Sequence, residues 1–306
     1  MSPLYPIDTK DPRAVAGLVK EAFADIGATA SFPLLDRLFE DVDGMFHGRY
    51  AGYQAIDMNY HDFEHTMQAT VCTIRLLQGR SRTPDRPLLT IRDWELGVMA
   101  VLLHDCGYLK PANDPIGTGA KYTFVHERRS CDFAREYLPR VGATATEIED
   151  ICAAIICTGP RNKISQVAFR TDAARHFAFV LVTADYLAQM SAPDYVDKLA
   201  PLYREFEEAF AFECIPPEKR PYATFRHARE DRRLLDQLCA PHARLRGGRR
   251  ASLFDVSGPA QSLSAGRGGQ SRRGPSAVAG RRGITSHPPP APVHVSYDRL
   301  SRVAGH

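Results

Sequence analysis

Six histidine and aspartate side chains have the types and spacing that suit a reactive site, and all of them but His61 are candidate ligands of one or two divalent metal ions. They are, in chain order, His61, His65, His104, Asp105, His126 and Asp185. A mixed set of imidazole and carboxylate ligands suits manganese, iron, cobalt, nickel or zinc better than calcium, and magnesium is a further candidate. An ion held in this way lowers the pKa of a bound water and so provides a nucleophile for hydrolysis at neutral pH.

Asp105 and Asp185 stand out because each lies within or at the end of an apolar segment. The pair His104-Asp105 closes the most hydrophobic stretch of the chain, which begins at Leu96. Asp185 follows the sequence Phe-Val-Leu-Val-Thr-Ala. A buried, ionised carboxylate costs much free energy unless a cation neutralises it. We therefore expect the two carboxylates to share one or two metal ions with histidines from other segments.

A single histidine on an amphipathic helix is more often an ordinary surface or core residue than a metal ligand, and His126 taken alone falls under that interpretation. It is also preferred for His47, His176, His227 and His242. The ordered combination of His65, then His104-Asp105, then Asp185 is much more specific than any one of its members.

The hydrophobic spacing predicts an all-α fold in which these residues lie on different helices. The expected helices cover about 12–27, 34–44, 62–78, 91–105, 124–138, 147–156, 172–192, 195–213 and 222–239. Capping boxes are expected at Thr90 with Asp93 and at Thr146 with Glu149. Further expected ends are Asp11-Pro12 and Asp172 as helix starts and Gly79 as a C-cap. The helix from 91 is so apolar that we expect it at the centre of the fold.

The composition changes at Pro241, which divides an acidic body from a basic tail. Residues 241–306 contain eleven Arg and two acidic residues, a net charge of +9, whereas the other 28 basic and 34 acidic residues give −6. The tail is rich in Gly, Pro and Ser and is expected to be disordered. An inert, solvated tail is preferred over an arm that binds nucleic acid, because aromatic residues for base stacking are scarce there.

The cysteine pattern and the hydropathy predict a cytoplasmic protein. The seven Cys show no C-x-x-C spacing, and most have apolar neighbours, which indicates a reducing compartment. The first eleven residues lack the apolar segment of a signal peptide. The longest apolar run, from Leu96 to Leu103, is far shorter than the roughly 20 residues that a membrane span needs. No membrane partner is expected, and the sequence does not predict an oligomeric state.

Three motifs over about residues 50–215 resemble the HD-domain metal-dependent phosphohydrolases, and within them the cyclic-nucleotide phosphodiesterases. The hallmark Tyr-His-Asn-x-x-His corresponds to Tyr60-His61-Asp62-Phe63-Glu64-His65. An apolar helix that ends in His-Asp-x-Gly-His corresponds to His104-Asp105-Cys106-Gly107-Tyr108. A later helix with Ala-Asp corresponds to Ala184-Asp185, followed by Ser191-Ala192-Pro193.

The resemblance implies a role for each matching residue. His65, His104, Asp105 and Asp185 would bind the first metal, and Asp105 would bridge to a second one. His61 matches the histidine that protonates the leaving alkoxide, a role that suits an imidazolium near neutral pH. His126 is similar to the histidine that binds the second metal in many HD-domain proteins. The fold implied is an HD-domain helical bundle over 51–240, with N-terminal helices (1–50) packed on it.

The sequence departs from the phosphodiesterase motifs at three places. Asp62 stands where the family has Asn, Tyr108 replaces the second histidine of His-Asp-x-x-His, and the purine-binding Gln of Phe-Phe-x-Gln has no counterpart. The expected function is hydrolysis of a small-molecule phosphoester by a metal-bound hydroxide, with a cyclic nucleotide first. A nucleoside monophosphate is the second substrate class, and a regulatory module that binds metal and nucleotide without turnover is the rival of another class.

Overall fold

Helix α4 (Ile91–Leu103) is buried along nearly its whole length and packs against α2, α3, α6 and α7. In this computed structural model, residues 7–82, 89–159, 162 and 164–220 are described. The other helices are α1 (Pro12–Asp25), α2 (Phe32–Phe46), α3 (Phe63–Ser81), α5 (His126–Tyr137), α6 (Ala145–Ile156), α7 (Asp172–Ser191) and α8 (Tyr195–Phe212). Short 3-10 turns η2 (Cys106–Tyr108) and η3 (Gly119–Tyr122) join α4 to α5.

The predicted all-α class is confirmed for the described residues, in which a single β-bridge between Tyr53 and Pro111 is the only extended pairing. The central place predicted for the helix from 91 is also confirmed, since Leu96 to Leu103 are all buried. The predicted helix at 222–239 and the basic tail at 241–306 lie outside the described residues. The predicted domain boundaries at 50 and 240 stay a prediction.

Helices α1, α3, α4, α6 and α7 begin at side-chain caps, and three of the predicted helix ends are wrong. The capping box at Thr90 and Asp93 is present, but the second one is formed by Thr144 and Glu147 and not by Thr146 and Glu149. Both pairs have the required spacing, and the extended backbone at Thr144, directly after the turn at Gly142, decides between them.

Thr171 caps α7 through a bond from the Ala174 amide, so Asp172 is the first helical residue and not the cap. Helix α3 runs through Gly79 to Ser81, since an isolated glycine does not by itself end a helix. At the other end of the same helix, the Asp62 side chain caps the first turn by accepting the His65 amide. At the start of the chain, Asp11 caps α1 with Pro12 at its first position, as predicted.

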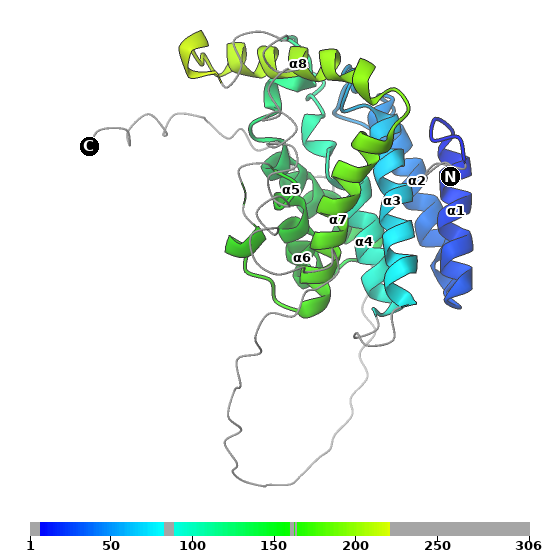
Figure 1. Ribbon diagram of the computed structural model, residues 1–306. Coiled ribbons are helices and arrows are strands. Elements are labelled where there is room, and N and C mark those ends of the chain that lie inside the picture. Colours follow the sequence, from blue (N-terminus) through cyan, green and yellow to red (C-terminus); the bar gives the residue numbers. More distant parts are fainter. Residues whose placement is uncertain (1–6, 83–88, 160–161, 163, 221–306) are drawn as a thin grey trace, which may run out of the picture. The chain divides into compact units, whose positions relative to one another are not determined.

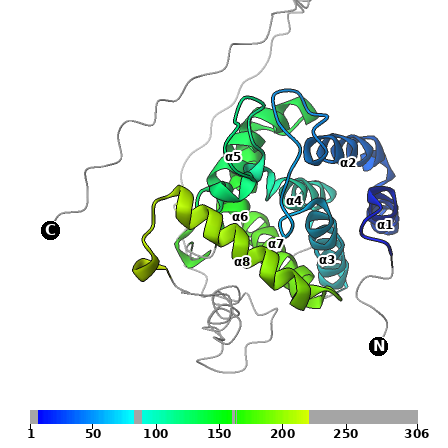
Figure 2. The ribbon, with the colours of Figure 1, turned by 90° about the horizontal axis from the view of Figure 1, so that it is seen from above.

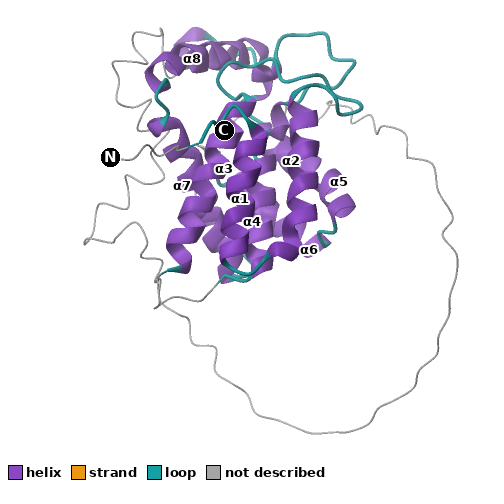
Figure 3. Cartoon of the chain, turned by 90° about the vertical axis from the view of Figure 1, so that its right-hand side faces the viewer, coloured by secondary structure: helices purple, strands orange, loops and turns teal. Residues whose placement is uncertain are grey.

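Helices α3, α4 and α7 run side by side, with α1 and α2 on one flank and α5 and α6 on the other (Figure 1, Figure 3). The N-terminal pair packs on the bundle through apolar contacts such as the edge-to-face pair of Phe23 in α1 and Trp94 in α4. These helices share one continuous hydrophobic core. None of the helices in the described part of the chain has the length and apolar character to cross a membrane.

Helix α8 lies across one end of the bundle, over the ends of α3 and α7 (Figure 1, Figure 2). It also packs on η3, where Glu208 accepts hydrogen bonds from the amide and the hydroxyl of Thr118. Two buried lysines order the neighbouring loop, because Lys110 and Lys121 donate to carbonyl oxygens within residues 116–117. The end of the bundle that α8 crosses is where the chemically capable residues gather.

The turn after α4 fits closely against the start of α5 because residue 107 is glycine. A Cβ placed at Gly107 would lie 1.9 Å from the carbonyl oxygen of His126 and 2.8 Å from the amide nitrogen of Ser130. Both are backbone atoms and cannot swing aside. At Gly97, within α4, an added Cβ would meet only the Leu77 side chain at 3.6 Å and Phe177 at 3.9 Å, which are ordinary contacts.

We expect Gly107→Ala to lower the free energy of unfolding by about 2–3 kcal/mol, because α5 must move away from the turn. The matched variant Gly97→Ala should be neutral or stabilise by up to about 1 kcal/mol, since alanine favours helix and has room. Urea denaturation of both variants measures the difference. Equal stabilities of the two variants would contradict the close packing at residue 107.

Candidate metal centre

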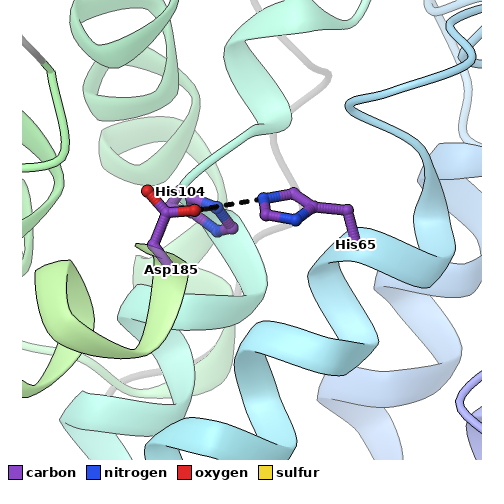
Figure 4. Close-up of side chains that lie close together, drawn as sticks. All are labelled: His65, His104 and Asp185. Carbon is purple, nitrogen blue, oxygen red and sulfur yellow. Dashed lines mark ion pairs between the residues drawn. The ribbon is translucent and has the colours of Figure 1, made fainter. Parts of the chain in front are cut away.

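The metal-binding candidates come from four helices that meet at one end of the bundle. His65 lies in the first turn of α3, His104 is the C-cap of α4, His126 is the first residue of α5, and Asp185 lies in the second half of α7. Figure 4 shows His65, His104 and Asp185 pointing toward one another from their separate helices. All of the predicted ligands are therefore brought to one place.

His65, His104 and Asp185 form a buried group that could hold a metal ion, since one ligand atom from each lies within 4.8 Å of the others. The Nε2 atom of His65 is 3.2 Å from Oδ1 of Asp185, and Nε2 of His104 is 3.8 Å from the same oxygen. Each imidazole also faces Asp105, whose Oδ2 lies 3.4 Å from His65 Nε2 and 3.2 Å from His104 Nε2.

The two oxygens of Asp105 face different histidines. While Oδ2 faces the group formed by His65 and His104, Oδ1 lies 3.8 Å from Nε2 of His126. A carboxylate with this orientation has the arrangement needed to bridge two ions. The Asp105 side chain is buried, as is His126.

Hydrogen bonds to carbonyl oxygens fix which nitrogen of two imidazoles faces the centre. Nδ1 of His104 lies 2.7 Å from the Val101 carbonyl oxygen, and Nδ1 of His126 lies 2.8 Å from that of Thr123. A carbonyl oxygen only accepts hydrogen bonds, so Nδ1 carries the proton in each ring. The lone pair of Nε2 is then directed to the centre, as metal ligation by a neutral imidazole requires.

Three buried atoms at the centre have no hydrogen-bond partner within the described residues: Nε2 of His65, Nε2 of His104 and Oδ2 of Asp105. Oδ2 of Asp105 lies 3.4 Å from Nε2 of His65 and 3.2 Å from Nε2 of His104. These are ion-pair distances, but the atoms are not aligned for hydrogen bonds. Buried polar atoms are nearly always satisfied, and here their unused lone pairs converge on one point. The donor set therefore fits a divalent cation.

The electrostatics of the centre favour positive charge. Burial opposes the charged form of His65, but the carboxylates of Asp105 and Asp185 outweigh it and raise the pKa of His65 from 6.5 to about 10. The pKa of Asp105 is well below its usual range, because the imidazoles of His104 and His65 outweigh the opposing effect of burial. A divalent ion would supply the same positive charge while leaving the imidazoles neutral.

Helix α5 holds the backbone of the His104–Leu109 segment in place. The Ser130 hydroxyl donates to the His104 carbonyl oxygen (2.6 Å) and accepts from the Gly107 amide (2.8 Å). The Arg129 guanidinium donates to the carbonyl oxygens of Gly107 and Leu109, each at 2.7 Å. These bonds satisfy the end of α4 and fix the direction of its last side chains.

His61 precedes α3, which begins at Phe63, so it does not share a helical face with His65. The two rings are nonetheless neighbours, with centroids 5.9 Å apart. Glu205 of α8 places His61: its Oε2 is 2.7 Å from His61 Nδ1, while its Oε1 accepts the backbone amides of Asn59 and Tyr60. Glu205 itself is buried.

A second chain of hydrogen bonds positions Asp185. The Tyr60 hydroxyl donates to Oε1 of Gln189 at 2.5 Å, and Nε2 of Gln189 donates to Oδ1 of Asp185 at 3.1 Å. The oxygen of Asp185 that faces both imidazoles is thus held by Gln189, one turn further along α7. Partners of this kind orient ligands in metal sites.

Tyr108 packs against both His61 and His126, whose own ring centroids are 6.2 Å apart. Its ring stacks on His126 with centroids 4.5 Å apart and on His61 with centroids 4.6 Å apart. The aspartate that replaces the family's asparagine has a structural role, because Asp62 caps α3 and forms an ion pair with Lys198 of α8 at 3.1 Å. That departure from the motif leaves the geometry of the centre intact.

Glu205 and Gln189 are supporting residues that the sequence motifs did not identify, whereas Tyr60 belongs to the first motif, where no role is predicted for it. One signal was present for Glu205: together with Leu202 and Ala209 it forms the buried stripe of α8, where an acid needs a partner. Two of the histidines that are not expected to bind metal, His47 and His176, lie within the described residues, and neither belongs to the metal centre. His47 and His176 lie close to their own helix backbone through Nδ1, and His227 and His242 lie outside the described residues.

The chain matches no protein-family model, no curated protein and no solved structure.

Loss of a residue that only orients a metal ligand weakens metal affinity by up to about 100-fold. Loss of a ligand should weaken it further, so we expect Asp105→Asn and Asp185→Asn each to weaken divalent-metal binding by at least about 100-fold. Each variant removes a negative charge from the buried centre. The matched control is Asp172→Asn, which lies on α7 like Asp185 but is 80% exposed. Metal analysis and a manganese titration of the chelator-treated proteins measure the effect. Wild-type affinity in both centre variants would exclude this ligand set.

We expect opposite pH dependences with and without metal. The raised pKa of His65 means that metal-free protein is stabilised by the protonated ring, so stability falls as the pH rises from 6.5 to about 10. Metal binding must displace this proton, so affinity falls on acidification by about tenfold per pH unit for each proton displaced.

Thermal unfolding across this pH range, with chelator and with excess manganese, measures both effects. His65→Gln should remove the loss of stability at high pH and weaken the response to manganese. A metal affinity that does not change with pH would contradict the role of His65.

Proposed function

We propose that this chain is a metal-dependent phosphohydrolase of the HD-domain type that cleaves a phosphodiester, with cyclic nucleotides as the first substrate class. The observation that carries the proposal is the shared carboxylate of Asp105, which faces His65 and His104 with one oxygen and His126 with the other. His61 lies beside this centre, with its ring centroid 6.2 Å from that of His126. The reducing cytoplasm is the proposed location, because the described cysteines are all free thiols.

His65, His104, Asp105 and Asp185 are the residues that would hold the first divalent ion, and His126 with the other oxygen of Asp105 would hold a second. When bound, such ions activate water and neutralise charge on a phosphoryl group. Manganese or iron suits these ligands, and magnesium, cobalt, nickel and zinc remain candidates. The protein's contribution is a buried, fixed set of donors, because Gln189 and Ser130 orient the groups on α7 and at the end of α4.

His61 is the proposed general acid. The Glu205 carboxylate accepts a hydrogen bond from Nδ1–H of His61. Nε2 is then the ring nitrogen that can give a proton to the departing oxygen. The same carboxylate also accepts the amides of Asn59 and Tyr60, so α8 fixes the main chain just before His61 as well as its ring. General-acid catalysis by a positioned imidazole contributes about 10²–10⁴-fold to a rate.

Nucleoside monophosphates are the second substrate class, because the same centre can act on a monoester. A specific observation supports the rival function of a regulatory module that binds metal and nucleotide without turnover. Tyr108 stacks on both His61 and His126 and stands where the phosphodiesterase motif has another histidine. The second ion would therefore have fewer protein ligands than in the family.

A substrate screen separates these functions. Protein loaded with manganese is incubated with cyclic nucleotides, nucleoside monophosphates and bis(p-nitrophenyl) phosphate, and product is followed by chromatography. We expect hydrolysis of a cyclic nucleotide that is lost in Asp105→Asn. Saturable nucleotide binding without product, in protein that holds metal, would establish the regulatory module instead.

We expect His61→Gln to lower kcat by about 10²–10⁴-fold on a substrate with a sugar-hydroxyl leaving group, without loss of bound metal. On bis(p-nitrophenyl) phosphate the loss should be much smaller, because p-nitrophenolate departs without a proton. His176→Gln, on α7 but away from the centre, is the matched control. Equal losses on both substrates would indicate a structural role for His61 and contradict the assignment.

A further inference from the structure

Two cysteines, Cys131 of α5 and Cys152 of α6, meet where these helices pack together. The Cys131 thiol donates to the Cys152 carbonyl oxygen at 3.5 Å, and the Cys152 thiol lies 3.7 Å from the Cys131 carbonyl oxygen in the reciprocal contact. Each sulfur therefore lies against the backbone of the other residue. A disulfide needs this kind of close approach between two main chains.

The pair forms part of the wall of a surface cavity of about 320 Å³. The cavity lies on the outer side of α5 and α6, and its lining includes the exposed Arg128 as well as Arg135. The cavity therefore borders both cysteines, although the two residues are nearly buried, with 2% and 3% exposed.

The surroundings of the two thiols make them unequal. The Cys131 side chain, which lies against the Cys152 thiol, lowers the pKa of Cys152, and the Arg135 guanidinium lowers it further, against burial, which raises it. The pKa of Cys131 is raised, first by its bond to Cys152 and then by burial. Elsewhere in the described chain, burial raises the pKa of Cys157 to about 12 and also raises that of Cys106. The charged groups around the pair are Arg128, Asp132, Arg135, Glu149, Asp150 and Arg170.

We propose that Cys131 and Cys152 form a reversible disulfide, which joins α5 covalently to α6 when the protein meets a hydroperoxide. The Cys152 thiolate attacks one peroxide oxygen, the O–O bond breaks, and a sulfenic acid forms as water or an alcohol leaves. The Cys131 sulfur then attacks the Cys152 sulfur, the S–S bond forms, the S–O bond breaks, and the hydroxyl leaves as water with the Cys131 proton. Two thiols lose two electrons in total, and one hydroperoxide gains them.

The disulfide would restrain the helix that supports the metal centre. Cys131 follows Ser130, whose hydroxyl holds the His104 carbonyl oxygen and the Gly107 amide. His126, at the start of the same helix, is five residues away. The cross-link is nevertheless independent of whether the centre hydrolyses a phosphoester, because it rests only on the packing of α5 against α6.

Peptide mapping of the full-length protein tests the proposal. The protein is exposed to hydrogen peroxide, denatured in N-ethylmaleimide and digested with trypsin without reductant. Peptide 130–135 contains Cys131 alone, whereas peptide 141–161 contains both Cys152 and Cys157. We expect the two peptides to appear joined, with a mass two hydrogens below their sum, and to separate again after treatment with dithiothreitol.

Three variants assign the bond. Cys157→Ser should keep the joined peptides, and Cys152→Ser should lose them. Cys131→Ser should also lose them and should leave a sulfenic acid at Cys152 that dimedone traps. The proposal is overturned if both peptides stay separate and alkylated at a peroxide dose that oxidises the exposed Cys214, or if Cys157→Ser abolishes the link. The wild type and Cys157→Ser decide the outcome even if the other variants fail to fold.

Discussion

Two carboxylates buried among three imidazoles set the constraint on which the rest of this structure depends. Asp105 and Asp185 lie beneath the surface at the meeting point of α3, α4, α5 and α7, where water cannot solvate their charge. Isolated charges in such a place are strongly disfavoured. The raised pKa of His65 shows that the surroundings take up a proton when nothing else supplies positive charge. A divalent cation could meet the same need and would satisfy the unpaired nitrogen and oxygen atoms as well.

The surrounding hydrogen bonds keep the donors in place at the ends of helices, where the backbone alone leaves them free to turn. Ser130 satisfies the carbonyl at the end of α4, Gln189 holds Asp185 from one turn away, and Glu205 fixes the segment before α3. Ser130 and Glu205 lie on helices other than the segments that they hold, whereas Gln189 lies on the same helix as Asp185. The precision of the centre thus comes from packing between helices as well as from the ligands themselves.

The helical class could be predicted from the sequence because apolar periodicity is a local signal, whereas the six candidate residues rest on the His-Asp pair, the buried carboxylates and the resemblance of three motifs. The choice between Thr144 and Thr146 as cap could not, since both have an acid three residues later and only the turn at Gly142 decides. Glu205 was missed because its partners, at 59–61, are about 145 residues away in the chain. The stacking of Tyr108 on both His61 and His126 is likewise a product of tertiary contact, which no spacing rule encodes.

The position of α8 across the end of the bundle has a consequence for the order in which the protein matures. Residues 59–62, which carry His61 and the cap of α3, bond to Glu205 and Lys198, so they reach their native positions only after α8 has been synthesised. Contacts between such distant segments require closure of a long loop and form slowly. A nascent chain that stops before α8 can already contain the donors of α3, α4, α5 and α7. It still lacks the anchor for His61, so assembly of the whole centre waits for the last of the described α-helices.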